Sequence, residues 1–353
     1  MTIAAILIAY AALAGTLGGG LLRRGPWAAR APLPGIIIWL AAAWSVIAAG
    51  VLASLSLAVD STAIGGQLSR VIGACVIRLR SAYATPGGRS VAWPSLAVTA
   101  IILVWAAAAV ARYLGTDRRL ALRHAETARL VGRRDPALGA VLLDHAVPAA
   151  YCVASRPPTV VVTSGALRAL DATQLAAVLA HEHAHLRAHH QLLRAIARIA
   201  RRTAPFLPLL RHADEQITRL IELHADDAAS RVSGPAPLAA ALAILASATP
   251  PDQSSGVAGM YDVPGVPGVS GMPGVSGEPG EPGLPGEPGV PGLSATSADV
   301  LQRIRRLLSP VAPVSPLRRR LLGAAALTLA VGPILLSLLP AIVALALGKV
   351  PAH

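Results

Sequence analysis

The sequence has few charged and few aromatic residues. Of its 353 residues, 14% are charged, 3% are aromatic and only one is phenylalanine, whereas 54% are hydrophobic. A soluble domain usually carries about a quarter of its residues as charges. The composition therefore argues against an ordinary soluble protein and leaves room for one catalytic domain with several membrane spans.

Cysteines are equally scarce. The two of them, Cys75 and Cys152, lie far apart in the sequence and form neither a CxxC pair nor a disulfide framework. A disulfide-stabilised fold is therefore excluded, and we expect the folded domain to lie in a reducing compartment.

Four apolar runs are each long enough to span a bilayer, which takes about 20 residues. They cover residues 2–22, 35–59, 93–111 and 321–347. The first run lacks the basic start of a cleaved signal peptide, and arginines follow it where a small-residue cleavage site should be. We therefore expect four transmembrane helices in a multi-pass protein of the cell membrane.

Basic residues flank these runs. Lys and Arg together number 31 against 18 Asp and Glu, and arginines stand at Arg23, Arg24, Arg112 and residues 318–320. This placement follows the positive-inside rule and does not indicate a phosphate-binding face, so we expect a lipid bilayer but no nucleic acid as a partner. The rule places the central segment in the cytoplasm and both termini outside.

The loop at residues 60–92 complicates this topology because it would lie outside and yet carries arginines. Its residues 66–83 alternate apolar and basic positions with helical spacing. An amphipathic helix on the outer membrane surface and an ordinary solvated helix both fit this pattern.

The central segment has the pattern of a small α+β domain. The elements expected are a helix at 113–134, strands at 147–154 and 159–164, and helices at about 171–202 and 213–232. Asp171 and Gln174 form a capping box at the start of the long helix at 171–202.

Glycine occupies every third position from residue 265 to residue 292, with proline in most triplets. This collagen-like repeat could form a short triple helix, which needs three chains. A disordered or polyproline II linker also fits, and we favour it.

The sequence predicts five segments. They are 1–112 with three spans, 113–250 as a peptidase domain, 251–295 as the linker, 296–320 as a basic juxtamembrane helix and 321–353 with the fourth span and a tail.

Residues 181–185, HEHAH, contain an HExxH motif within the predicted long helix. Residues four apart share one helix face, so His181 and His185 can bind one metal ion together. Glu182 reaches the same edge and can take a proton from a water molecule whose pKa a zinc ion has lowered. The motif predicts Zn2+ as the cofactor and Glu182 as the catalytic base.

A catalytic zinc ion needs a third protein ligand and one open position. Glu222 and Asp226 stand downstream, four residues apart on one predicted helix face. We expect Glu222 to be the third ligand and Asp226 to hydrogen-bond the outer nitrogen of a ligating histidine. A solvated carboxylate is the alternative for Glu222 and a surface salt bridge for Asp226. His212 and His224 are further candidates, for stabilising the oxyanion.

Four sequence blocks together resemble the membrane gluzincin peptidases. They are PAAYC at 148–152, VVVTSGAL at 160–167, LAAVLAHEHAHL at 175–186 and ELHAD at 222–226. The chain is most similar to the BlaR/MecR-type antirepressor peptidases and next to the HtpX-like and CAAX-prenyl-protease group. The resemblance implies that the strand before the zinc helix, near residues 147–151, offers its edge to the substrate. Only residues 348–353 follow the fourth run, so we do not expect a β-lactam sensor domain there.

The fold class we expect is α+β, mostly α: a multi-span helical membrane protein with a zincin-type HExxH peptidase domain. The expected function is zinc-dependent endopeptidase cleavage of a cytoplasmic protein or peptide, such as a transcriptional repressor. A membrane-protein quality-control protease is the alternative enzyme. The non-enzymatic alternative is a membrane scaffold that assembles through the Gly-X-Y repeat. The activating signal and the oligomeric state stay open.

The arginine pattern predicts the orientation of the chain. A reporter fused after Arg202 should give a cytoplasmic signal, and one fused after His353 should give an external signal. Paired fusions to alkaline phosphatase and to a fluorescent protein measure this. A cytoplasmic signal at the C-terminus would mean that the number of spans is odd.

Overall fold

The computed structural model describes residues 2–24, 27–58, 88–113, 115, 118–153, 159–248, 297–309 and 314–346. The chain divides into two compact units, which are described separately. The first comprises Met1–Ala121, His183–Ala228 and Val311–His353, and the second Leu122–Glu182 and Ala229–Pro310. The predicted helix at 66–83, the Gly-X-Y repeat and Cys75 lie outside the described residues.

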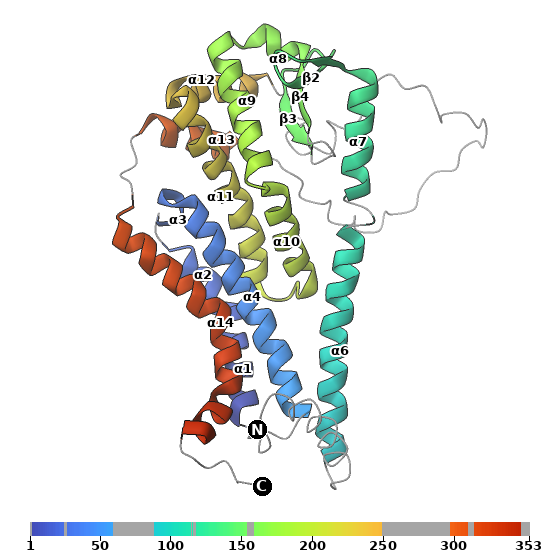
Figure 1. The fold of residues 1–353 in the computed structure, drawn as a ribbon, viewed down its shortest axis with the longest axis vertical. Helices are drawn as coiled ribbons and strands as arrows, with labels where there is room; N and C mark the ends of the chain where they lie inside the picture. Colours follow the sequence, from blue (N-terminus) through green and yellow to red (C-terminus); the bar gives the residue numbers. More distant parts are fainter. Residues whose placement is uncertain are drawn as a thin grey trace, which may run out of the picture. The chain divides into compact units, whose positions relative to one another are not determined.

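The first unit is built of helices (Figure 1). They are α1 (Thr2–Leu13), the π-helical stretch η1 (Ala14–Gly18), α2 (Gly19–Leu22), α3 (Trp27–Arg30), α4 (Pro32–Ala58), α6 (Gly88–Arg112), α10 (His190–Thr203), most of α11 (Pro208–Ser233) and α14 (Pro316–Ala346). Helix α4 packs against α1, α6, α10 and α14 and forms the centre of this unit. Two hydroxyl hydrogen bonds join it to its neighbours: Tyr10 donates to Ser45 over 2.9 Å, and Thr99 donates to Ser54 over 2.6 Å. Such bonds hold helices together where no water is available.

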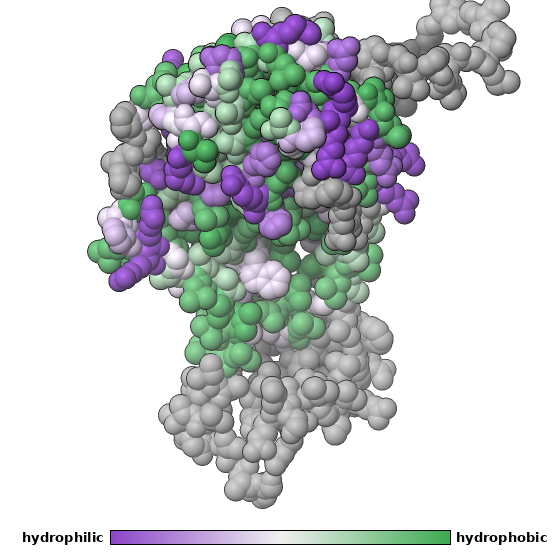
Figure 2. All heavy atoms as spheres, turned by 45° about the horizontal axis from the view of Figure 1, so that its top comes forward, coloured by the Kyte–Doolittle hydropathy of each residue, from purple (hydrophilic) through white to green (hydrophobic). Residues whose placement is uncertain are grey.

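Among the described residues, three helices are long and apolar enough to cross a membrane: Ile3–Leu22, Pro32–Leu57 and Pro316–Leu339. They agree with three of the four predicted spans. Large apolar side chains such as Leu13 and Leu327 are exposed on them, and broad hydrophobic surface is visible in Figure 2. This exposure suits contact with lipid acyl chains, and the chain is a membrane protein by this criterion.

The remaining predicted span, at 93–111, differs from the other three. It lies within helix α6, where the described residues contribute the apolar stretch Thr99–Arg112. That α6 crosses the bilayer therefore stays a prediction.

The second unit holds a small sheet and the helices around it. Its elements are α7 (Arg118–Val131), β1 (Arg133–Asp135), β2 (Ala140–Leu143), β3 (Ala150–Val153), β4 (Thr159–Thr163), α8 (Ser164–Ala169), α9 (Ala172–Arg187, through Glu182), α12 (Pro235–Ser247) and α13 (Ser297–Leu308). The strand order is β1-β2-β4-β3, with β2 and β4 parallel and the other two pairs antiparallel. The buried valines of β4 lie at the centre of the sheet, and β3 forms one of its edges. The two predicted strands are confirmed as β3 and β4.

Helix α9 begins as predicted. The Asp171 carboxylate accepts a hydrogen bond from the Gln174 backbone N–H over 2.8 Å, and the Gln174 side chain accepts one from the Asp171 N–H over 3.0 Å. This reciprocal pair is a capping box and satisfies two of the unpaired donors at a helix start. The Thr173 hydroxyl also donates to Asp171, and these bonds lower the pKa of that carboxyl group.

The predicted helix at 171–202 is wrong in one respect, because the chain breaks it. Helix α9 ends at Arg187, His189 adopts a left-handed conformation with φ of 50°, and α10 begins at His190. No glycine or proline marks this break. Its cause is tertiary, because it turns the fully buried His190 toward His185, as described below.

Gly165 follows β4 at the point where two chain segments approach most closely. A Cβ atom at this position would lie 2.2 Å from the carbonyl oxygen of Ala146, which is backbone and cannot rotate away. Gly165 also donates its N–H to the carbonyl of His145 over 2.9 Å. A side chain here would therefore push apart the segment that holds β4 and α8 in place.

We expect Gly165→Ala to lower the free energy of unfolding by about 1–3 kcal/mol, the usual cost of overpacking. The midpoint of thermal unfolding in detergent measures this. Gly20→Ala is the matched control, because a Cβ atom at Gly20 meets nothing within 4 Å. Equal midpoints for the two variants would contradict the close approach.

Candidate metal centre

Helix α9 presents two histidines on one face. His181 and His185 are one helical turn apart, and each is 6% exposed. A buried polar ring is stable only when its nitrogens have partners. The two rings therefore need hydrogen-bonding groups or a metal ion close by.

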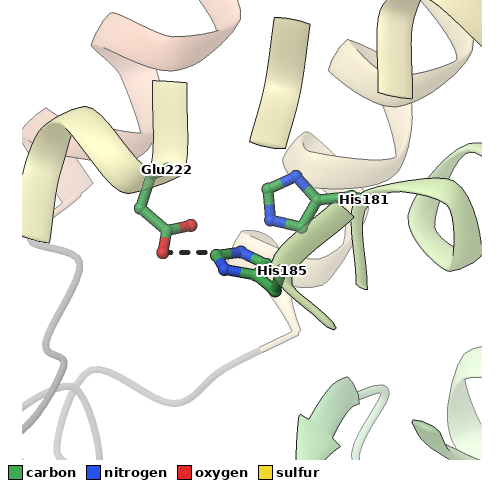
Figure 3. Close-up of side chains that lie close together, drawn as sticks. All are labelled: His181, His185 and Glu222. Carbon is green, nitrogen blue, oxygen red and sulfur yellow. Dashed lines mark ion pairs between the residues drawn. The ribbon is translucent and has the colours of Figure 1, made fainter. Parts of the chain in front are cut away.

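Helix α11 brings a carboxylate to this pair. His181, His185 and Glu222 offer three ligand atoms that all lie within 4.8 Å of one another, and their side chains converge in Figure 3. The distance from Nε2 of His185 to Oε1 of Glu222 is 3.7 Å. Ligand atoms bound to one tetrahedral zinc ion lie about 3.4 Å apart. The group thus needs to close only slightly on an ion, and two imidazoles with one carboxylate are the donor set of many catalytic zinc sites.

The break at His189 adds a third histidine behind the first two. In an unbroken helix, His190 would lie about 140° around the axis from His185 and face away from it. In the structure its Nδ1 lies 2.9 Å from Nδ1 of His185, and its Nε2 lies 2.9 Å from Nδ1 of His224. His190 is fully buried between them. Sequence reasoning missed this residue because its contact depends on the backbone reversal.

These contacts assign the proton positions once His185 binds a metal ion. Its Nε2 faces Glu222, so Nε2 would be the atom that binds an ion and the proton would lie on Nδ1. That proton is donated to Nδ1 of His190, which then carries its own proton on Nε2 and donates it to His224. The contacts with His190, and through it with His224, thus hold the ring of His185 in place.

Arg194 lies one turn beyond His190 on α10 and supports the other ligand. Its guanidinium group forms an ion pair with the carboxylate of Glu222 and is mostly buried. One helix therefore supports one histidine and the carboxylate of the candidate centre. The i, i+4 spacing of His190 and Arg194 was the only sequence signal for this role, and arginines are too common in α10 for it to stand out.

The other predicted site residues lie near the group. Glu182 is half-buried and follows His181 directly on α9. Asp226 is fully buried one turn beyond Glu222 on α11. A carboxylate without solvent exposure is not a surface salt bridge, so that alternative for Asp226 is wrong.

The two histidines proposed for the oxyanion have other surroundings. His212 lies ten residues before Glu222, or about 15 Å along α11. It lies 3.4 Å from Glu215 and beside Gly19 of the first span, too far from the group to stabilise an oxyanion. His224 is the last member of the histidine chain behind His185.

The two buried histidines of the HExxH motif and the partly exposed Glu222 downstream form the His-His-Glu group of a class of metallopeptidases. The chain belongs to peptidase family M48, which its residues 115–310 match. This match contains the sheet, α9 and α11. No curated protein and no solved structure matches the sequence. The protein is thus a membrane-associated member of a metallopeptidase family.

The histidine chain predicts an effect on metal affinity. His190→Ala should weaken zinc binding by about 10–100-fold, because it removes the acceptor that orients His185. His190→Gln keeps a carbonyl acceptor and should recover part of the loss. Competition with a chromophoric chelator measures the dissociation constant without any substrate.

The matched control is His189→Gly. His189 is exposed, and glycine adopts its left-handed conformation freely. If His190→Ala and His189→Gly bound zinc equally tightly, the ring of His185 would not depend on His190.

Proposed function

We propose that the protein is a membrane-anchored zinc metalloendopeptidase that cleaves a cytoplasmic protein or peptide. The observation that carries this proposal is the convergence of His181, His185 and Glu222 within 4.8 Å, beside Glu182, in the region that matches peptidase family M48. Three protein ligands leave the fourth position of a zinc ion open, as catalysis requires.

The proposed reaction uses the chain's own groups as follows. A bound zinc ion would polarise the scissile carbonyl and lower the pKa of water at its open position. Glu182 accepts the proton of the attacking water and then donates it to the leaving amine nitrogen. His190 holds the ring of His185, and Arg194 holds the carboxylate of Glu222. Asp226 is proposed to hold a ligating histidine in the same way.

The substrate chain is proposed to bind along β3. This strand is an edge of the sheet, and an extended peptide can add to such an edge through main-chain hydrogen bonds. Tyr151 and Cys152 of β3 are partly exposed. Both β3 and Glu182 belong to the second unit, which also favours this arrangement.

The identity of the substrate is a narrower proposal. The resemblance to BlaR/MecR-type peptidases favours a transcriptional repressor, and the resemblance to HtpX-like proteins favours membrane-protein quality control. Both enzymatic proposals need Glu182, whereas a membrane scaffold does not. The decisive test of peptidase function is therefore a change at Glu182 that leaves the metal ligands in place.

Glu182→Gln should retain zinc and lose about three or more orders of magnitude in peptide hydrolysis, because a carboxamide cannot accept the proton of water. Purified protein in detergent, zinc content by atomic emission and cleavage of a peptide library measure both effects. The exposed Glu126 on α7 provides the matched change, Glu126→Gln, which should leave both quantities unaltered.

The same variant can identify the substrate. Crosslinking with Glu182→Gln in cells should capture a chain that the unaltered enzyme degrades. Full hydrolysis by zinc-loaded Glu182→Gln protein would exclude the proposed base.

A further inference from the structure

Helices α10 and α11 form a hairpin that turns at residues 204–207. One face of α11 packs into the main apolar core of the first unit, against helix α4. This core contains Ile36, Trp39, Ala42, Ala43 and Val46 from α4, and Leu209, Leu210, Ala213, Ile217, Leu220 and Ile221 from α11. The hairpin was not among the predicted spans, because its arms carry several arginines.

Helix α4 gives a first measure of how deep the hairpin reaches. Leu220 lies against Gly35, near the start of the apolar stretch Pro32–Leu57. Leu207 lies in the same core as Val46, close to the middle of that stretch, and both approach Gly15. From Leu220 to Leu207, α11 covers about 20 Å at 1.5 Å per residue, and α4 covers about 17 Å from Gly35 to Val46. The two helices therefore run side by side over about half of the apolar stretch.

The first span gives an independent measure. The side chain of Leu207 would lie 3.0 Å from a Cβ atom at Gly15, which is near the middle of Ile3–Leu22. About one turn nearer the hairpin's open end, Leu209 and His212 lie against Gly19. Small residues allow such close approach between helices in a bilayer. Both spans thus place the turn of the hairpin near their midpoints, and Figure 1 shows this turn beside the middle part of α4.

The surface of the hairpin is apolar where it lies deepest. No charged residue occurs from Thr203 to Leu210. Phe206, the only phenylalanine of the chain, is 78% exposed at the turn. A large exposed aromatic side chain in an uncharged stretch would be unfavourable in water and is suited to acyl chains.

The charged residues nearest the turn are Arg201 and Arg202 on α10 and Arg211 on α11, and Arg202 is half-buried. Arg201 of α10 pairs with Asp214 of α11 over 3.1 Å, which closes the two arms on each other. Arg211 is exposed, but it lies about 6 Å nearer the open end than Leu207 and is long enough to extend toward the headgroups. Pairing of a charge, and extension of an arginine side chain to the headgroups, both lower the free-energy cost of placing a charged residue near the hydrocarbon core.

We propose that the α10–α11 hairpin is a re-entrant membrane element, inserted from the side of the peptidase domain to about the middle of the bilayer, with Phe206 in contact with acyl chains. Lipid acyl chains contact the exposed apolar face of the hairpin. Glu222 lies about 22 Å above Leu207 along α11, whereas half of the hydrocarbon core is about 15 Å thick. The metal ligands then lie at the level of the headgroups. On the proposed peptidase function, which this last step assumes, the bond that is cut lies in a chain segment next to the membrane surface.

The experiment measures lipid contact and not peptidase activity. Cys75→Ser and Cys152→Ser remove the native thiols, and single cysteines are then introduced in the full-length protein by Phe206→Cys, Leu17→Cys and Leu130→Cys. Leu17 is exposed within the first span, and Leu130 is exposed on α7 of the second unit. Each protein is labelled with an environment-sensitive fluorophore in phosphatidylcholine bilayers. The lipids carry bromine quenchers either close to the headgroup or near the chain ends.

The label at Phe206→Cys should be quenched most strongly by chain-end bromines, as the label at Leu17→Cys should be. A charged, membrane-impermeant thiol reagent should react with unlabelled Phe206→Cys about a hundredfold more slowly than with Leu130→Cys, because the reagent must leave water. Zinc content and elution volume equal to those of the parent protein show that each variant is folded.

Two outcomes would overturn the proposal. If Phe206→Cys reacts as fast as Leu130→Cys and no lipid quenches its label, the turn lies in water. If the residue neither reacts nor is quenched, protein and not lipid covers it. Full hydrolysis by the Glu182→Gln protein would contradict the proposed catalytic base but would leave each of these results unchanged, so the two proposals fail separately.

Discussion

The packing of helix α11 against helix α4 is the constraint on which the first unit depends. Leucine and isoleucine side chains along α11 fill the spaces beside Trp39 and the small residues of α4, and they are almost completely buried. Burial of one such side chain contributes about 1.5–3 kcal/mol. Because Leu220 is fixed against Gly35, the position of Glu222 two residues later is fixed as well. A carboxylate that must meet two imidazoles within a few ångströms is thus held by apolar contacts and not by the flexible ends of loops.

Helix α10 completes this arrangement from the other side. The left-handed residue His189 costs about 1–2 kcal/mol in an L-amino acid, and nothing local offsets that cost. What the break provides is a second helix whose first turn meets His185 and whose second turn meets Glu222. A strained backbone conformation persists where the surrounding packing enforces it. Residues in such conformations cluster near functional sites.

Most of the candidate site followed from the sequence because it depends on helical spacing alone. His181 and His185 are one turn apart in any helix, and Glu222 and Asp226 repeat that relation. The capping box at Asp171 was predictable from the spacing of Asp171 and Gln174, and three of the spans from the length of their apolar runs. The break at His189 was not, because only the contacts of His190 explain it. Strands β1 and β2 were missed as well: the residues of β1 are all charged, and β2 has four residues whose apolar run is too short to separate from a loop.

The ion pair of Arg194 with Glu222 has a consequence for how the protein is assembled. A small zinc domain is unfolded until its metal arrives, because its ligands repel one another and no core holds them. Here the carboxylate already has a cationic partner, and the helices that carry it are joined by a large apolar core. The chain can therefore complete its helical packing before any ion is delivered. On the proposed metal site, loading would then be the last step of maturation, and a delayed ion supply would leave a folded chain and not an unfolded one exposed to degradation.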